Sequence, residues 1–93
     1  MKRKIRCLDK NEAEKLSSMI FLKEGKETYI IEILNIIDNE IVVKLKDKSA
    51  HSILLKDNSQ VEDFADFVQS VFEKEHKIIS TEIFGEEVEI IKE

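Results

Sequence analysis

The sequence predicts a single α+β domain over residues 1–93, with a mainly antiparallel sheet, one short helix and one long helix. Segments that alternate apolar and polar residues recur between tight-turn residues, which is typical of antiparallel strands. Two other segments repeat apolar residues at helical spacing. Ile, Val, Leu and Phe make up about a third of the chain, enough for one folded core.

The chain begins with a predicted strand and the start of a helix. Lys2–Leu8 places Ile5 and Cys7 on one face and charged residues on the other, the pattern of a half-buried strand. Asn11, with Glu14 three residues later, has the spacing of a capping box, so we expect a helix to begin there.

The end of this first helix has two interpretations. Met19–Leu22 is compatible with a last helical turn or with a strand that pairs with the next segment. Gly25-Lys26 favours the strand, because a two-residue loop that starts with Gly suits a type II′ hairpin. We therefore predict a helix over about residues 10–17, followed by a strand.

Glu27–Ile37 is the most apolar stretch and has apolar residues on both faces of a predicted strand. This pattern indicates a central strand that is covered on both faces, or on one face by a second copy in a homodimer. Asp38-Asn39 then favours a tight turn into strands at Glu40–Lys46 and Ala50–Lys56. Strict alternation assigns the apolar residues to two faces, Tyr29, Ile31, Ile33 and Ile37 on one and Ile30, Leu34 and Ile36 on the other.

A long helix and a closing hairpin complete the expected order. Ser59 and Glu62 have the spacing of a capping box, and the helix that follows ends near Glu75. Strands at Lys77–Phe84 and Glu87–Lys92 complete a β-α-ββββ-α-ββ order with about five to seven strands. The long helix is expected to pack through an apolar stripe that includes Phe64, Val68, Val71 and Phe72.

The net charge of −5 is divided unevenly along the chain. Residues 1–56 carry 12 Lys and Arg against 9 Asp and Glu, a net +3. Residues 57–93 carry 3 against 11, a net −8. Either the two halves neutralise each other in the fold, or the acidic half attracts a basic partner.

The polar face of the long helix is the leading candidate site. Its carboxylates cover roughly a quarter of the helix circumference, opposite the Phe stripe, with no Lys among them. Together with the closing hairpin they predict one acidic surface that docks on a basic protein, such as a nuclease or another nucleic-acid-binding protein. The candidate partner-binding residues are Glu62, Asp63, Asp66, Glu73, Glu82, Glu86, Glu87 and Glu89.

The basic start of the chain supplies an alternative, nucleic-acid binding through Lys2, Arg3, Lys4 and Arg6. Thirteen of the 15 cations are Lys, however, whereas Arg is favoured where phosphates are held by two hydrogen bonds. A nucleic-acid partner is therefore the weaker expectation. A homodimeric structural protein is a further alternative.

The residues that could carry catalysis are few and scattered. Cys7 falls on the inward face of its strand, and His51 and His76 lie in separate segments without the spacing of a zinc site. Two glycines provide no phosphate-binding loop. We expect no enzyme activity, no cofactor and no metal. The lone cysteine and the lack of a long apolar run indicate a cytoplasmic protein without a membrane segment.

Two resemblances can be weighed against these patterns. Residues 10–75 are similar in element order to a double-stranded-RNA-binding domain. In that family the second helix opens with lysines that contact phosphates. Here the corresponding turn reads Ser59-Gln-Val-Glu-Asp-Phe64, and its acidic residues argue against RNA binding. In size, acidity and lack of catalytic motifs the chain also resembles bacterial toxin-immunity proteins and phage-encoded inhibitors such as anti-CRISPR proteins. This resemblance implies a small inhibitor or regulator of bacterial or phage origin.

Overall fold

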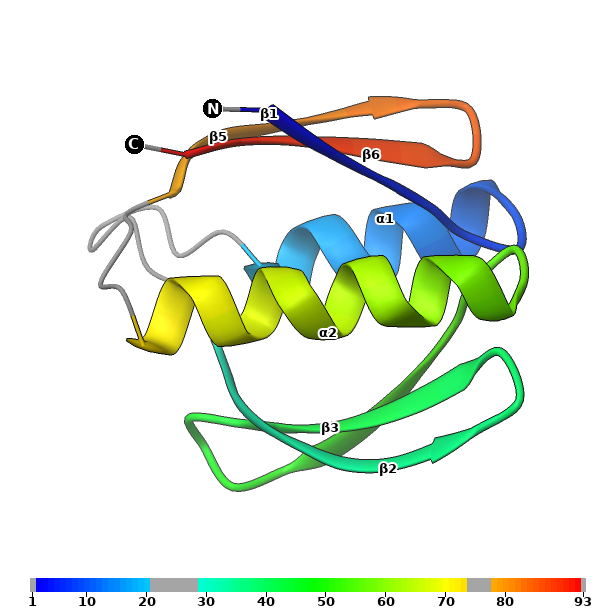
Figure 1. The fold of residues 1–93 in the computed structure, drawn as a ribbon. Coiled ribbons are helices and arrows are strands. Elements are labelled where there is room, and N and C mark those ends of the chain that lie inside the picture. Colours follow the sequence, from blue (N-terminus) through cyan, green and yellow to red (C-terminus); the bar gives the residue numbers. More distant parts are fainter. Residues whose placement is uncertain (1, 21–28, 74–77, 93) are drawn as a thin grey trace.

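The computed structural model describes residues 2–20, 29–73 and 78–92 and places two helices in a layer between two antiparallel sheets (Figure 1). The first sheet has the strand order β1-β6-β5 and the second sheet has the order β2-β3-β4. Within these residues the elements are β1 (Lys2–Arg6), α1 (Lys10–Ile20), β2 (Ile30–Ile37), β3 (Glu40–Leu45), β4 (Ala50–Leu54), α2 (Asn58–Glu73), β5 (Ile78–Phe84) and β6 (Glu87–Lys92).

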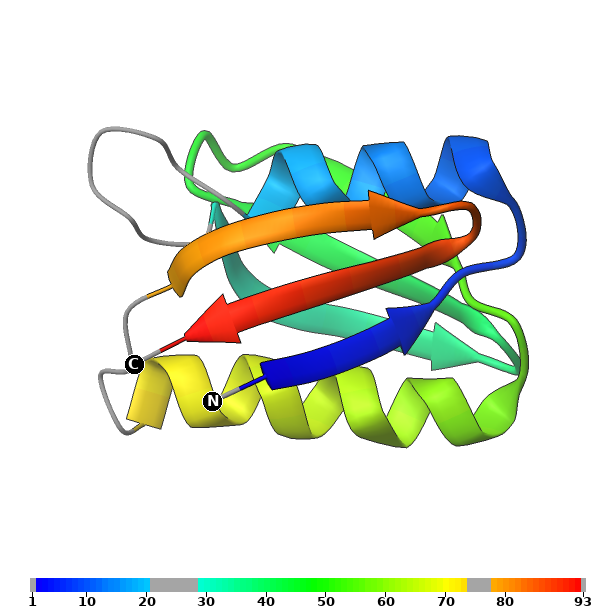
Figure 2. The ribbon, with the colours of Figure 1, turned by 90° about the horizontal axis from the view of Figure 1, so that it is seen from above.

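The first sheet brings the two ends of the chain together. β1 pairs with β6 in antiparallel register, with Ile5 opposite Val88 and Lys4 opposite Glu89. β5 pairs with the other side of β6 through a turn in which Gly85 adopts a φ of 62°, a conformation that glycine tolerates well. Seen from above, β6 lies between β1 and β5, with the helices along the two sides (Figure 2).

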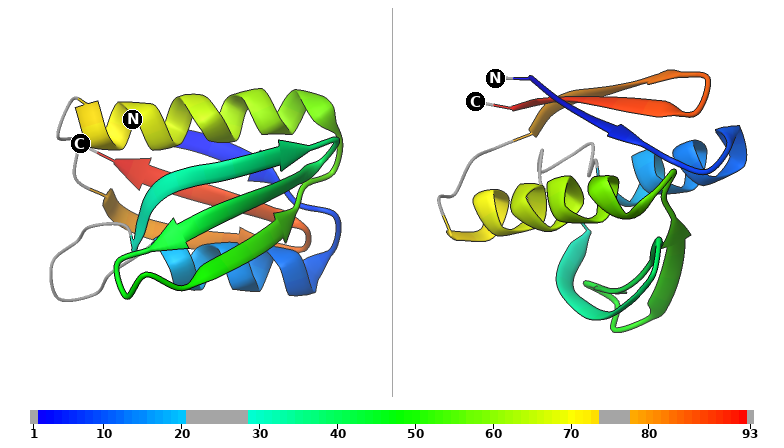
Figure 3. Two further views of the ribbon diagram at one scale, coloured as in Figure 1. Left: turned by 90° about the horizontal axis from the view of Figure 1, so that it is seen from below. Right: turned by 45° about the vertical axis from the view of Figure 1, so that its right-hand side comes forward.

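The second sheet curves below the helices, with β2 at one edge and β3 in the middle (Figure 3). The ladder between β2 and β3 shifts register twice, so Ile31 and Leu34 have no directly opposite residue. These bulges break the strict alternation that the sequence predicted. Ile30, Ile33 and Ile36 consequently lie opposite the inward-facing row Leu45, Val43 and Ile41 of β3.

The two sheets meet at one corner through Cys7 and Leu55, which form an isolated antiparallel bridge. The Leu8 amide donates to the Leu54 carbonyl over 3.0 Å, and the Lys56 amide donates to the Arg6 carbonyl over the same distance. Because these bonds join the ends of β1 and β4, the sheets cannot separate at this corner without losing backbone hydrogen bonds.

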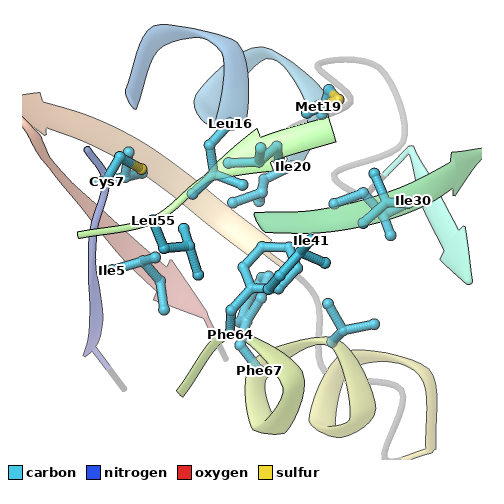
Figure 4. Close-up of a cluster of buried hydrophobic side chains, with 14 of the residues drawn as sticks. Ile5, Cys7, Leu16, Met19, Ile20, Ile30, Ile41, Leu55, Phe64 and Phe67 are labelled. Carbon is cyan, nitrogen blue, oxygen red and sulfur yellow. The ribbon is translucent and has the colours of Figure 1, made fainter. Parts of the chain in front are cut away.

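The core lies between the two sheets and is lined by both helices. Figure 4 shows Ile5, Leu55, Leu16, Ile41 and Phe64 pointing into one cluster, and all five are fully buried. α1 contacts β4, β5 and β6, whereas α2 contacts β1 and β2, so each helix bridges both sheets. The predicted burial of Phe64 and Val68 is confirmed, and the side chains of residues 71 and 72 lie outside the described set.

Aspartates two residues earlier than expected cap both helices. Asp9 Oδ1 accepts a hydrogen bond of 2.9 Å from the Glu12 amide, so the predicted cap at Asn11 is wrong. Asp57 Oδ1 accepts from the Ser59 and Gln60 amides at 3.0 and 3.3 Å. The Ser59 hydroxyl itself donates to Asp57, which lowers the pKa of this carboxyl and keeps it charged at the helix N-terminus.

The α+β class with two helices is confirmed, but its strands form two sheets instead of one. α1 continues to Ile20, so the strand expected from Met19 is wrong at its first two residues, and residues 21–28 lie outside the described part. The six described strands fall within the expected five to seven. The prediction of a central, doubly covered strand at Glu27–Ile37 is also wrong, because β2 is an edge strand with exposed apolar side chains.

Candidate functional site

The carboxylates of the closing hairpin lie beside the cations of β1. Glu86 Oε1 is 3.3 Å from an Arg6 nitrogen, and its Oε2 is 3.2 Å from Lys56 Nζ. Glu89 Oε1 is 3.7 Å from Lys2 Nζ. The structure thus places Glu86 and Glu89 of the acidic hairpin beside cations of the basic first half. Mutual neutralisation of the two halves was one of the two arrangements expected from the uneven charge distribution.

On the outer face of the first sheet, cations and carboxylates occupy neighbouring strands. Lys4 lies opposite Glu89, which lies opposite Glu82 on the next strand, and Arg6 lies opposite Glu87. Oppositely charged residues in directly opposite positions attract each other by a few tenths of a kcal/mol up to about 1 kcal/mol. This face therefore carries both signs of charge and does not form a purely acidic surface.

The carboxylates of α2 are in a different situation. Glu62, Asp63 and Asp66 are exposed, and among the described residues none of them forms an ion pair. Glu62 and Asp66 are four residues apart on the helix, a spacing at which like charges repel. Glu73 ends α2, and its side chain lies outside the described set. The described carboxylates Glu62, Asp63 and Asp66 are called the α2 ridge below.

The basic strand β1 separates the α2 ridge from the hairpin carboxylates. Arg3 Nη1 donates to the Asp63 carbonyl over 3.2 Å, and the Arg6 amide donates to Gln60 Oε1 over 2.8 Å. One flank of α2 therefore faces β1, and β6 lies on the other side of β1. The seven described acidic candidates are divided into two groups with cations between them, Glu62, Asp63 and Asp66 in one and Glu82, Glu86, Glu87 and Glu89 in the other.

Three of the four candidate nucleic-acid-binding cations are engaged within the chain. Lys2 and Arg6 pair with Glu89 and Glu86, and Arg3 donates to the helix backbone at Asp63. Lys4 lies opposite Glu89 in the strand register but forms no ion pair among the described residues. A phosphate would have to compete with existing contacts for the other three cations.

Cys7 is buried in the core, as its strand pattern predicted. Burial raises the pKa of its thiol to about 12, and the negative charges of Glu12, Asp9 and Glu86 add to this effect. A thiol with such a pKa is a poor nucleophile and a poor metal ligand at neutral pH. In the described ranges no three His, Cys, Asp or Glu side chains gather as a metal site requires, and His76 lies outside those ranges.

A pocket of about 580 Å³ lies between the end of α1 and the β3–β4 turn. At its rim the Ser49 hydroxyl donates to Asp47 Oδ1 over 2.5 Å, which lowers the pKa of the Asp47 carboxyl. His51 Nε2 is 2.9 Å from the same hydroxyl. The Ser49 hydroxyl thus lies between the Asp47 carboxylate and the His51 ring. The pocket is lined by Lys15, Ser18, Met19, Tyr29, Leu45, Lys46, Asp47 and His51.

The sequence reasoning did not select the edge of β2 as a site. Ile31, Leu34, Ile36 and Ile37 are between 41% and 56% exposed, side by side on one strand. Their apolar pattern on both faces was visible in the sequence, where it indicated a central strand covered on both faces or a strand covered on one face by a second copy. The edge position comes from the pairing of β3 with β4, which the pattern of β2 alone does not determine.

Comparisons with models of protein families, with curated proteins and with solved structures found no match to this chain. Among the described residues no helix is both long and apolar enough to span a bilayer. The function is therefore inferred from the charged surfaces of α2 and of the first sheet.

Proposed function

We propose that this protein is a non-enzymatic binding module that docks the α2 ridge on a basic protein surface, as a small inhibitor or regulator. The observation that supports this proposal is the contrast between two sets of carboxylates. The carboxylates of Glu86 and Glu89 have cations within 3.7 Å, whereas the carboxylates of Glu62, Asp63 and Asp66 form no ion pair in the described part of the chain. Arg3 contacts Asp63 through its backbone carbonyl, at 3.2 Å.

The position of the ridge on α2 strengthens this proposal. Glu62, Asp63 and Asp66 all lie beyond the first turn of α2, which holds no acidic residue, so the helix dipole contributes little to stabilising their charges. Repulsion between Glu62 and Asp66 costs the isolated helix a few tenths of a kcal/mol. A basic partner would relieve this repulsion and release counterions on binding, so its association should weaken as salt is added.

The class of partner follows from the same chemistry. Spaced carboxylates on a rigid helix present charges to Lys and Arg in the way that nucleic-acid phosphates do. A nuclease or another nucleic-acid-binding protein exposes many such cations. The resemblance to phage-encoded inhibitors and toxin-immunity proteins is consistent with this partner class.

Charge reversal tests the proposal with a matched control. Glu62→Lys/Asp66→Lys changes the net charge by the same amount as Glu82→Lys/Glu87→Lys on the first sheet. With a fluorescent deca-lysine peptide as the probe at ~50 mM salt, we expect the helix pair to weaken binding at least ~10-fold and the sheet pair to weaken it about twofold. Equal weakening would show that net charge alone attracts the probe and would contradict docking on the ridge.

The alternative of nucleic-acid binding through β1 has less support, because Lys2, Arg3 and Arg6 already have partners within the chain. A gel shift with duplex and single-stranded DNA at low salt tests it directly. We expect no shift with either probe. A salt-sensitive shift that Lys2→Glu/Lys4→Glu abolishes would favour β1 over the α2 ridge.

A further inference from the structure

The free edge of β4 is the side of the second sheet that lies next to α1. Just beyond this strand, the Leu55 amide donates to the Asn39 carbonyl over 2.8 Å, so Leu55 directs its backbone groups toward the hairpin of β2 and β3. Successive residues of an antiparallel strand direct these groups to alternate sides, so those of Leu54 and Ser52 point to the free edge. β4 has no Lys, Arg, Asp or Glu of its own that would protect this edge.

Three groups from outside the second sheet bind these outward-facing backbone groups. Glu12 Oε2 accepts a hydrogen bond from the Leu54 amide over 3.1 Å, and Lys15 Nζ donates to the Ser52 carbonyl over 2.8 Å. The Leu8 amide donates to the Leu54 carbonyl over 3.0 Å. A neighbouring strand would supply acceptors and donors in the same places, so these groups substitute for a further strand along this part of β4.

The two α1 side chains also stabilise each other. Lys15 Nζ is 3.6 Å from Glu12 Oε2, and residues three apart on a helix lie on the same face. The Glu12 side chain is only 16% exposed, so its carboxylate has lost much of its hydration. Burial of a charge is costly unless protein groups replace the lost water, and the Leu54 amide and the Lys15 ammonium do so here.

We propose that Glu12 and Lys15 form an intramolecular cover that keeps the edge of β4 from pairing with another strand. Free amide and carbonyl groups at a sheet edge are a template for strand addition. The strand that is present in every solution of this protein is β4 of a second copy. With Glu12 and Lys15 in place, a second copy would first have to displace two hydrogen bonds and one ion pair.

The edge of β1 in the first sheet has a similar cover, which α2 supplies. Gln60 Oε1 accepts from the Arg6 amide over 2.8 Å, and the Lys56 amide donates to the Arg6 carbonyl over 3.0 Å. β1 also carries four cations, which protect an edge by themselves. β4 lacks such charges and therefore depends more on its cover. The inference does not rest on the proposed function, because Glu12 and Lys15 lie outside the α2 ridge.

Amide hydrogen exchange of the full chain, followed by NMR, tests the cover at the Leu54 amide. We expect Glu12→Ala to raise the exchange rate of this amide at least ~10-fold, because it removes the acceptor. Glu12→Gln keeps an acceptor oxygen and should raise the rate less than ~3-fold. Glu14→Ala changes an exposed carboxylate of the same helix and is the matched control. An unchanged Leu54 rate in Glu12→Ala would overturn the inference, as would an equal rise at the core amide of Ile41.

Gln60→Ala provides a crossed comparison between the two covers. This variant should raise the exchange rate of the Arg6 amide and leave the Leu54 amide protected. Glu12→Ala should do the reverse. A rise at both amides in either variant would show that the whole fold has loosened and would contradict two separate covers.

Sedimentation velocity tests whether the cover prevents strand pairing. Glu12→Ala/Lys15→Ala removes one charge of each sign, and so does the control Lys10→Ala/Glu14→Ala, whose two residues are exposed on the same helix. Between ~20 and ~200 µM we expect the average mass of the first variant to rise further than that of the control or of wild type. If the first variant sediments like the control at both concentrations, the cover does not prevent pairing and the inference fails.

Discussion

The two sheets rest on the same core but leave different surfaces to solvent. The outer face of the first sheet interleaves Lys2, Lys4 and Arg6 with Glu87 and Glu89, so its charges are balanced within the fold. The second sheet ends in an edge strand of Ile and Leu with a single charge. The net charge of the chain therefore does not describe any one surface.

A partner gains most binding free energy where it does not first have to break contacts within this chain. Pairs that are already formed, such as Arg6 with Glu86, must be broken before either residue can contact a partner. The carboxylates of the α2 ridge form no ion pair among the described residues, so none has to be broken there. The ridge is for this reason the surface that we propose for a basic partner.

The largest expected effect concerns Cys7, which lies where the two sheets join. With a pKa of about 12, its thiolate fraction at pH 8 is roughly a thousandfold below that of a free thiol. Iodoacetamide should therefore modify Cys7 at least that much more slowly in the folded protein than in urea, as followed by mass spectrometry. Rapid modification of the folded protein would show that the sheets separate at this corner.

The next largest effect tests the shared core. Phe64 is fully buried, with its ring centroid 6.4 Å from that of Phe67, whereas Phe84 is 55% exposed on the first sheet. Phe64→Ala should lower the free energy of unfolding by about 3–5 kcal/mol because it removes a large buried side chain. The control Phe84→Ala should change it by less than about 0.5 kcal/mol in the same urea titration. Similar losses for the two variants would contradict the assigned core.

The sequence predicts those parts of the fold that depend on residues close together in the chain. It does not predict contacts between residues far apart in the chain. The Phe stripe of α2 and the turn before β6 are local patterns, and both were predicted. Both caps were misplaced by two residues, because Asp9 precedes Asn11, Asp57 precedes Ser59, and any of these side chains can cap. The pairing of β1 with β6 joins opposite ends of the chain, which no local pattern reveals.

The candidate sites were likewise predictable where they depend on local spacing and not where they depend on strand order. The sequence predicted Glu62, Asp63 and Asp66 on the polar face of α2 from helical spacing, which is a local property, and all three are exposed. Their separation from the hairpin by β1 depends on the non-local order β1-β6-β5. The bulges at Ile31 and Leu34 are equally invisible in an alternating pattern.

A smaller effect tests the charge pairing on the first sheet. Glu86→Gln removes contacts with both Arg6 and Lys56, whose side chains are about half exposed. Exposed ion pairs contribute little, so we expect a loss of less than about 1 kcal/mol in low salt, with the difference shrinking as salt is added. Glu82→Gln, which has no ion-pair partner in the described part of the molecule, should have a smaller effect. A loss at Glu86 that does not depend on salt would argue against pairing.

The smallest effect is the pH dependence of the α2 cap. The Ser59 hydroxyl and the helix amides lower the pKa of Asp57 in the folded state below its unfolded value of about 4. The charged carboxylate thus stabilises the fold above pH ~4, and this contribution is lost as the pH falls through the folded pKa. Urea midpoints between pH 6 and pH 2.5 should fall less steeply for Asp57→Asn than for wild type. Ser59→Ala should shift the wild-type fall to higher pH, and identical profiles would contradict the cap.

The central claim, that the α2 ridge is the docking surface, is tested most directly by NMR. Deca-lysine is titrated into the uniformly ¹⁵N-labelled full chain, and the amide shifts of every residue are followed. The account predicts that the largest shifts surround Glu62 and Asp66 and vanish when salt is added, while β6 shifts little. Dominant shifts at Glu87 and Glu89 would contradict it.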